Sequence, residues 1–176
     1  MLPQVRVDEG LPPSGPFSLV QIEPITLDAV KFISWRMRDK DRQEISSTTM
    51  KLRPDEFAET FSRICKFGFV VSRDNQPVAV FGINEVWPGR FEAMMIATDH
   101  WQSVALSAAK EIRRNLLPKI RNAGMKLGFC FVRKDNDPAF RWARYLGFKE
   151  QTQIEGWGKN DEAVKFLTLF GITPSR

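Results

Sequence analysis

The sequence predicts an α/β protein with a mixed central β-sheet flanked by helices. Three strand-like segments at 67–72, 77–87 and 90–97 follow one another across short turns, which is typical of an antiparallel meander. A helical pattern, a strand and a second helical pattern come next, and this alternation places helices across a sheet. The segment 90–97 is apolar on both faces except at Glu92, which indicates a central strand covered on both sides.

The N-terminal segment differs from the rest of the chain. Residues 1–16 contain four prolines and two glycines and show little periodicity, so we expect a proline-rich extended arm. The whole chain has 176 residues, of which 43% are hydrophobic. That length suits one well-buried core, and we expect 17–176 to form a single domain.

A strand and three helices are predicted before the meander. The strand runs from Phe17 to Pro24, and Thr26 or Asp28 can cap a helix over 27–35. The polar stretch 36–49 predicts a second short helix followed by a loop. Pro54 and Asp55 can start a third helix, which places one apolar face over the following residues: Phe57, Phe61 and Ile64.

The second half of the chain alternates helix and strand. An apolar side chain recurs every four residues in the first helix, which has Pro118 near its end: Val104, Ala108, Ile112 and Leu116. A strand at 126–132 leads to a helix that Asp137 can cap and that Gly147 can end. Two closing strands are expected at about 149–155 and 163–170.

Composition limits the classes of function. The net charge of +5 and the sequence pI near 9.4 allow an acidic partner. Cys65 and Cys130 lack the spacing of a metal site or redox pair, so no metal is expected. No apolar run reaches the roughly 18 residues of a membrane span, and no signal-peptide pattern begins the chain. We therefore expect a soluble protein of a reducing compartment.

Two motifs resemble those of a known family. Asn136 is followed three residues later by Ala139, and the same helix ends in Leu-Gly-Phe at 146–148. With the order of elements over about 17–170, this pattern resembles the GNAT family of N-acyltransferases. The stretches "RWARYLGF" at 141–148 and "EVWPGRFEAMMIATDH" at 85–100 are similar to those of GNAT-like proteins of short-tailed bacteriophages, several of which are internal virion or assembly proteins.

The resemblance implies a binding site for acetyl-CoA or another acyl-CoA where two central parallel strands separate. The family holds the CoA pyrophosphate with a Q/R-x-x-G-x-G/A loop, which corresponds here to "QSVALS" at 102–107. Ala105 and Ser107 replace the glycines, so the backbone would approach a ligand less closely. The residues implied at the cofactor site are Ile96, Ala97, Thr98, Gln102, Ser103, Val104, Ala105, Leu106, Ser107 and Asn136.

The residues that would serve as acid and base in such a reaction match the family pattern less well than the loop does. GNAT enzymes commonly carry a tyrosine seven residues after the asparagine as a general acid, and here that position is Ala143. Tyr145 lies about 200° further around the helix. Glu92 is the candidate general base because burial in an apolar strand would raise its pKa, with Glu85 as the alternative. Pairing of Glu92 with an arginine, or a place at a frayed strand end, is the structural alternative. His100 has no evident catalytic partner.

Three functions agree with these residues. The first is a structural or assembly protein of a phage particle, found in the virion or the host cytoplasm, with phage virion proteins as partners and a degenerate acyl-CoA site. The second is an acyl-CoA-dependent N-acyltransferase that uses Glu92 and an amine acceptor. The third is a nucleic-acid-binding protein, in which phosphates would contact a set of basic residues that otherwise form a solvated helix face: Lys110, Arg113, Arg114 and Arg121.

Overall fold

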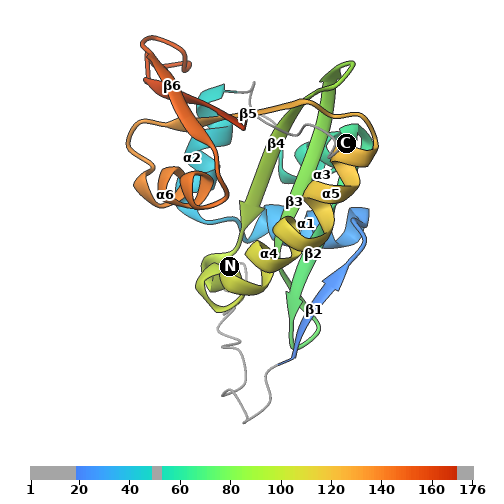
Figure 1. Cartoon of the computed structure of the whole chain (residues 1–176). Coiled ribbons are helices and arrows are strands. Elements are labelled where there is room, and N and C mark those ends of the chain that lie inside the picture. The colour runs from blue at the N-terminus through green and yellow to red at the C-terminus, as the bar shows by residue number, and fades with distance from the viewer. Residues whose placement is uncertain (1–18, 49–52, 170–176) are drawn as a thin grey trace, which may run out of the picture.

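The computed structural model describes residues 19–48 and 53–169, and the predicted arm at 1–16 lies outside these ranges (Figure 1). The strands are β1 (Val20–Glu23), β2 (Cys65–Arg73), β3 (Gln76–Trp87), β4 (Arg90–Ala97), β5 (Leu127–Arg133), β6 (Lys149–Ile154) and β7 (Val164–Leu169). The helices are α1 (Leu27–Trp35), α2 (Asp39–Thr48), α3 (Pro54–Ile64), the 3₁₀-helix η1 (Asp99–Ser103), α4 (Ala105–Glu111), the π-helical turn η2 (Ile112–Leu116), α5 (Leu117–Asn122) and α6 (Asp137–Tyr145).

Seven strands form one mixed sheet in the order β1-β2-β3-β4-β5-β7-β6. All neighbouring pairs are antiparallel except β4 and β5, which run parallel. The predicted meander is present as β2, β3 and β4, and β4 is the central strand. The prediction of an α/β protein with a mixed, helix-flanked sheet is therefore confirmed.

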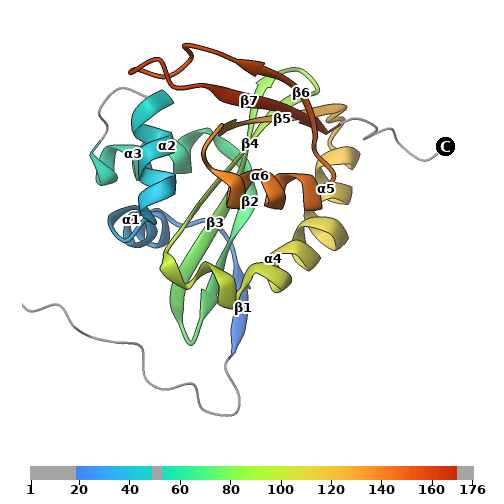
Figure 2. The same ribbon diagram turned by 90° about the vertical axis from the view of Figure 1, so that its left-hand side faces the viewer.

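Helices cover both faces of this sheet. On one face, α1 and α3 place Val30, Ile33 and Phe61 against the sheet residues Val70 and Val80. On the other face, α4, η2 and α5 pack their apolar stripe against the opposite side of β2, β3 and β4. Figure 2 shows the two groups of helices on opposite sides of the sheet. The alternation of side chains along each strand produces these two apolar layers.

The C-terminal half of the sheet has its own core. Helix α6 contributes Ala143, which packs with Cys130 and Val132 of β5 and Leu167 of β7. This cluster adjoins the main core through Ala93 and Leu146. None of the helices in the described ranges is long and apolar enough to cross a membrane.

Local sequence signals account for most element boundaries. Thr26 accepts the Ala29 N–H and caps α1, as predicted. Asp74 and Asn75 adopt positive φ in the tight turn between β2 and β3, where such residues are tolerated. The cap of α6 differs from the prediction, because Asn136 rather than Asp137 accepts the Ala139 N–H. Asp137 is already the first helical residue.

The helix after β4 continues past the proline where the sequence suggested its end. Pro118 lies inside a helical run that extends to Asn122. Proline donates no backbone hydrogen bond and crowds the preceding turn. Just before it, the Leu117 N–H bonds to the Ile112 carbonyl in a π-helical turn. This wider turn accommodates the proline without ending the helix.

Candidate active site

The parallel strands β4 and β5 separate after three rungs. Residues 90–92 pair with residues 127–129, and the ladder ends there. Beyond this point β4 stays paired with β3, whereas β5 pairs with β7. A cavity of about 100 Å³, which we call the central cavity, lies between the diverging strands, with Ala93 and Met95 on one side and Cys130 and Val132 on the other.

A shallow groove of about 380 Å³ lies outside the central cavity, between η1, α4 and α6. We call it the outer groove, and Gln102, Leu106 and Arg141 line it. Trp101 and Trp142 line both hollows and pack edge to face with their ring centroids 4.8 Å apart. The indole rings therefore form the wall between the outer groove and the central cavity. The Trp142 indole N–H is buried and has no hydrogen-bond partner in the described part of the chain.

A pocket of about 370 Å³, the inner pocket, adjoins the central cavity on its other side and is larger than that cavity. It lies among α2, α3, β4, Phe131 of β5 and Trp157 of the β6–β7 loop. The two hollows share four lining residues, Glu44, Ala93, Met95 and Phe131. The outer groove, central cavity and inner pocket thus follow one another where the central strands separate.

Glu92, the candidate base of the sequence, lines the inner pocket. It is the last residue of β4 that pairs with β5. Burial raises the pKa of the Glu92 carboxyl, while a hydrogen bond with the Asn84 side chain opposes this shift. None of the arginines in the described ranges forms an ion pair with it. Its partly buried place beside a cavity keeps it a candidate base.

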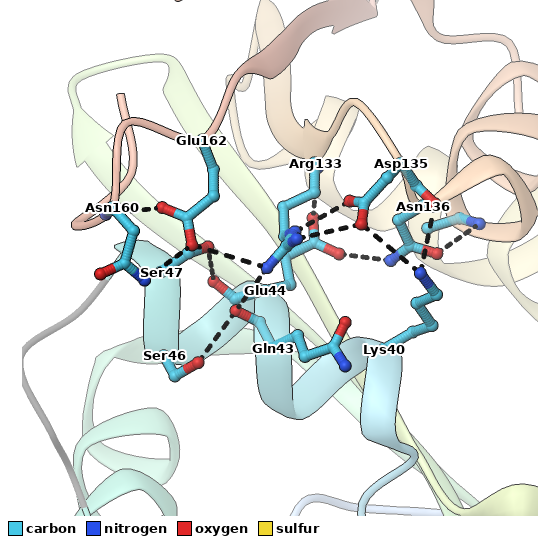
Figure 3. Close-up of polar contacts among 11 residues, drawn as sticks. Lys40, Gln43, Glu44, Ser46, Ser47, Arg133, Asp135, Asn136, Asn160 and Glu162 are labelled. Atoms are coloured by element: carbon cyan, nitrogen blue, oxygen red, sulfur yellow. Dashed lines mark hydrogen bonds and ion pairs between the residues drawn. The ribbon is translucent and has the colours of Figure 1, made fainter. Parts of the chain in front are cut away.

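Glu44, which was not among the candidate residues predicted from the sequence, is a second carboxylate at the site. It lies on α2 and lines both the inner pocket and the central cavity. The Asn136 side-chain amide donates to Glu44 Oε2 at 2.6 Å, and the Arg133 backbone N–H donates to Oε1 at 3.2 Å (Figure 3). Burial raises the pKa of Glu44 to about 7, although both hydrogen bonds act in the opposite direction. In the sequence, its spacing of three residues from Asp41 places the two carboxylates on one face of the predicted helix, but does not show that this face is turned inward.

Asp41 closes one end of the central cavity. Its Oδ2 accepts the Ala97 backbone N–H at 2.9 Å, and the Ala97 carbonyl accepts the Arg38 N–H at 2.9 Å. Arg38 also donates twice to Asp41 through its guanidinium. Burial raises the pKa of Asp41, and the charge and hydrogen bonds of Arg38 oppose the rise. The backbone of Ala97 is therefore bonded within the protein.

The residues that the resemblance placed at the cofactor lie in three environments. Ile96, Ala97, Thr98 and Val104 are buried, and Thr98 caps η1 by accepting the His100 N–H. Gln102, Ser103 and Leu106 are exposed, whereas Ala105 and Ser107 are partly buried. Of these, Gln102, Ala105 and Leu106 line the outer groove. Asn136 is 2% exposed and uses its side chain to cap α6 and to hold Glu44.

The other titratable candidates line neither the central cavity nor the inner pocket, although Tyr145 lines the outer groove. Glu85 pairs with Lys66 at 2.7 Å, which lowers the pKa of its carboxyl. Tyr145 is 49% exposed, its ring stacks on Trp142, and the Arg113 guanidinium lies 4.4 Å from its ring centre. His100 is exposed. In the described ranges no group of three or more metal-binding side chains is placed to hold an ion.

The four basic residues of the nucleic-acid hypothesis lie along α4, η2 and α5. Lys110, Arg113 and Arg114 are exposed, and Arg121 is partly buried. Arg113 also donates to the Tyr145 carbonyl, so its guanidinium is held against α6. Binding to nucleic acid stays a prediction, for which the test is a steep fall of affinity with salt.

Comparisons with known proteins concern the fold. No protein-family model and no curated protein matches the sequence. The structure is similar to the ribosomal-protein-S18-alanine N-acetyltransferase from Escherichia coli, with a TM-score of 0.66 and 16% identity over 90% of this chain and 97% of that chain. It is also similar to Ard1 from Thermoplasma volcanium, with a TM-score of 0.68 and 12% identity over 86% and 97%.

A third similar structure is yncA from Salmonella typhimurium, described as an acetyltransferase with its cofactor acetyl-CoA. Its TM-score is 0.65 at 12% identity, over 86% of this chain and 93% of that chain. This chain therefore has the GNAT acetyltransferase fold, which confirms that part of the sequence prediction. The narrower likeness to phage proteins stays a prediction.

Proposed function

We propose that this protein is an acyl-CoA-dependent N-acyltransferase. The observation that carries the proposal is the series of three adjoining hollows at the point where β4 and β5 separate, with two carboxylates at its inner end. Perturbed carboxylates in a cavity are typical of catalytic sites. The acetyl-CoA in the structure of the Salmonella typhimurium neighbour supports the choice of acyl donor.

Each hollow has a part in this proposal. The outer groove would take the phosphate-bearing end of an acyl-CoA, with Arg141 and Gln102 as donors. The central cavity would take the arm that carries the thioester. The buried indole N–H of Trp142 is a donor without a partner in the described ranges, so an amide carbonyl on that arm would satisfy it. The inner pocket would hold the amine.

The chemistry requires a base and a proton for the leaving group. The thioester supplies an electrophilic carbonyl carbon. A carboxylate of the inner pocket accepts a proton from the acceptor ammonium, and the amine nitrogen then forms a bond to the acyl carbon as the carbon–sulfur bond breaks. In the described part of the chain no tyrosine lines the central cavity or the inner pocket, so the leaving sulfur takes its proton from the substrate nitrogen or from water. Glu92 is the base that the sequence predicts.

Calorimetric titration with acetyl-CoA tests the proposal. We expect micromolar binding that Arg141→Ala weakens by about tenfold, because a charge-assisted hydrogen bond contributes on the order of 1.5–3 kcal/mol. Gln102→Ala should weaken binding less. Arg63→Ala is the matched control, since Arg63 is exposed on α3 and lines none of the three hollows. Absence of binding at millimolar acetyl-CoA would overturn the proposal.

A second candidate is the assembly role in a phage particle. This role includes a degenerate acyl-CoA site, which is favoured by the packing of Trp101 and Trp142 between the outer groove and the central cavity, where an acyl-CoA arm would have to pass. Ala105 and Ser107 stand where the pyrophosphate loop of the GNAT family has glycines, and their side chains would also hinder the close approach of an acyl-CoA. In that case Glu92→Gln should leave particle yield unchanged, and deletion of residues 1–15 should lower it without changing the melting temperature. Loss of yield in a folded Glu92→Gln protein would speak against this role.

A further inference from the structure

Among the described residues, the lining of the inner pocket is mostly apolar and its charged side chains are all acidic. Its aromatic walls are Phe57 and Phe61 of α3 and the stacked pair Phe131 and Trp157, whose ring centroids lie 4.8 Å apart. Isoleucine and methionine side chains complete much of the lining. Within residues 19–48 and 53–169, Glu44 and Glu92 are the only titratable residues that line it. A volume of about 370 Å³ accommodates a small molecule with a ring.

The position of Glu44 connects this pocket to the proposed place of the thioester. Glu44 lines the inner pocket and the central cavity, whereas Glu92 lines the inner pocket alone. Asn136 and the Arg133 backbone each hold one carboxylate oxygen of Glu44. The carboxylate is therefore fixed in orientation at the junction of the two hollows. Carboxylate oxygens each accept more than one hydrogen bond, so Glu44 can also accept one from a ligand.

The contacts around Glu44 make this arrangement rigid. Arg133 donates to Asp135 at 2.9 Å and to the Gln43 carbonyl at 3.4 Å, and Lys40 lies 3.5 Å from Asp135 (Figure 3). These contacts join α2 to the turn between β5 and α6. The network thus holds the helix that carries Glu44 against the strand that borders the central cavity. A fixed base near a reacting atom needs less reorganisation during reaction.

On the basis of the proposed function, we infer that the acyl acceptor is a primary amine on a flat apolar group, and that Glu44 receives the proton from its ammonium. The ring lies among the aromatic side chains of the inner pocket, and the ammonium nitrogen lies at Glu44, next to the thioester. One N–H bond of the ammonium breaks, its proton goes to a Glu44 oxygen, and the electron pair left on nitrogen forms a bond to the acyl carbon. The carbon–sulfur bond then breaks, and the leaving sulfur takes a second proton from the same nitrogen. Amines with hydroxyl groups along their length are disfavoured, because an apolar wall leaves those groups without partners.

The charges around Glu44 support proton transfer near neutral pH. Burial raises the pKa of Glu44, and Asp41 on the same helix adds to the rise. The charge of Arg133 on β5 lowers it, and Glu162 of the β6–β7 loop lies beside that guanidinium. Asp41 is itself paired with Arg38, and Glu92 lines the same pocket from β4. A carboxylate with a pKa of about 7 accepts and releases a proton at neutral pH.

The test is a calorimetric titration of the protein with 2-phenylethylamine in the absence of acyl-CoA. We expect binding at least about tenfold tighter than that of 2-phenylethanol, which lacks the ammonium, and of ethanolamine, which lacks the ring. Glu44→Gln should weaken the binding of 2-phenylethylamine by at least about tenfold. In the wild type the affinity should rise as the pH increases through about 7, because Glu44 then loses its proton, and this rise should be absent from the variant. Glu150→Gln, on the exposed surface of β6, is the matched control and should bind normally.

Trp157→Ala provides a second variant, because Trp157 is 46% exposed and its loss should not unfold the protein. This substitution should weaken the binding of 2-phenylethylamine and leave the affinity for ethanolamine unchanged. Equal affinity for all three ligands, or unchanged binding in both variants, would overturn the inference. Because acetyl-CoA and the amine are titrated separately, failure of acetyl-CoA to bind would count against the proposed function and not against the amine pocket.

Discussion

The side-chain amide of Asn136 donates to Glu44 Oε2 at 2.6 Å, across 92 residues of sequence. The carbonyl oxygen of the same side chain accepts the Ala139 N–H and starts α6. One buried asparagine thus performs two tasks, the beginning of a helix and the placement of a carboxylate on α2. The asparagine of the family motif has a structural function here, in addition to any contact with a ligand.

Asn136→Ala should therefore lower the free energy of unfolding by about 1–3 kcal/mol, since it removes a helix cap and a charge-assisted hydrogen bond together. Urea denaturation measures this change. Asn160→Ala is the control, because Asn160 is an exposed residue that also bonds to a carboxylate, that of Glu162. The interpretation is wrong if the two variants lose the same stability.

The pH dependence of stability should report on Glu44. Burial raises the pKa of this carboxyl from 4.5 to about 7, so the folded protein keeps the proton to a higher pH than the unfolded chain does. The contribution of Glu44 to stability is therefore lost as the pH rises from about 4.5 to about 7. Glutamine does not titrate, and the stability of Glu44→Gln relative to wild type should rise by on the order of 3 kcal/mol across this range.

Urea denaturation at about pH 5 and about pH 8 measures the difference. Glu150→Gln serves as the control, because its side chain is exposed on β6 and lines none of the three hollows. A difference between wild type and Glu44→Gln that does not change with pH would show that Glu44 titrates like an exposed glutamate.

Gly128 lies opposite Phe91 in the last parallel rungs before the strands separate. A Cβ atom at Gly128 would meet the Phe91 ring at 2.3 Å, so Gly128→Ala should cost about 1–3 kcal/mol of stability through overpacking. Phe91→Leu should relieve part of this loss, since the smaller side chain leaves room for the added methyl group. Thermal or urea unfolding of the two single variants and the double variant gives the coupling energy. Strictly additive effects would contradict the proposed contact.

Tyr145→Phe should leave the rate of acyl transfer within about twofold of wild type, because Tyr145 lines the outer groove and not the central cavity, where the thioester would lie. A general acid normally contributes about 100-fold or more. The ring of Tyr145 is stacked on Trp142 beneath Arg113, so the phenylalanine retains the packing. Steady-state kinetics with acetyl-CoA and 2-phenylethylamine measure the effect. Glu44→Gln, assayed beside it, should lower kcat by at least about 100-fold. A large loss in Tyr145→Phe would restore this residue as the acid.

Most elements could be predicted because local rules decide them. Thr26, Pro54 and the Asp74–Asn75 turn act on residues a few positions away, and the structure follows them. The position of the α6 cap was predicted one residue too late, since Asn136 and Asp137 have similar capping preferences and only the backbone at Asn136 is non-helical. Pro118 was predicted near the end of its helix, because the helix propensities of the residues do not indicate a π-helical turn.

The candidate site was predicted in part. Glu92 could be found, because a single carboxylate in a strand that is otherwise apolar on both faces breaks a regular pattern. Glu44 could not be found in this way, because α2 is polar along most of its length and its period does not show which residues face inward. Similarly, the contact between Trp101 and Trp142 could not be predicted from the sequence, since the two residues lie on separate helices.

The helices, the meander, the central place of β4 and the class of fold can be inferred from the order of residues, because each follows from the period of apolar residues and from capping or turn residues nearby. The point where β4 and β5 separate, the hollows that adjoin it and the carboxylate at their junction are visible only in the folded chain. Desolvation and hydrogen bonding of Glu44 depend on groups 89 and 92 residues away, which are brought beside it by folding alone.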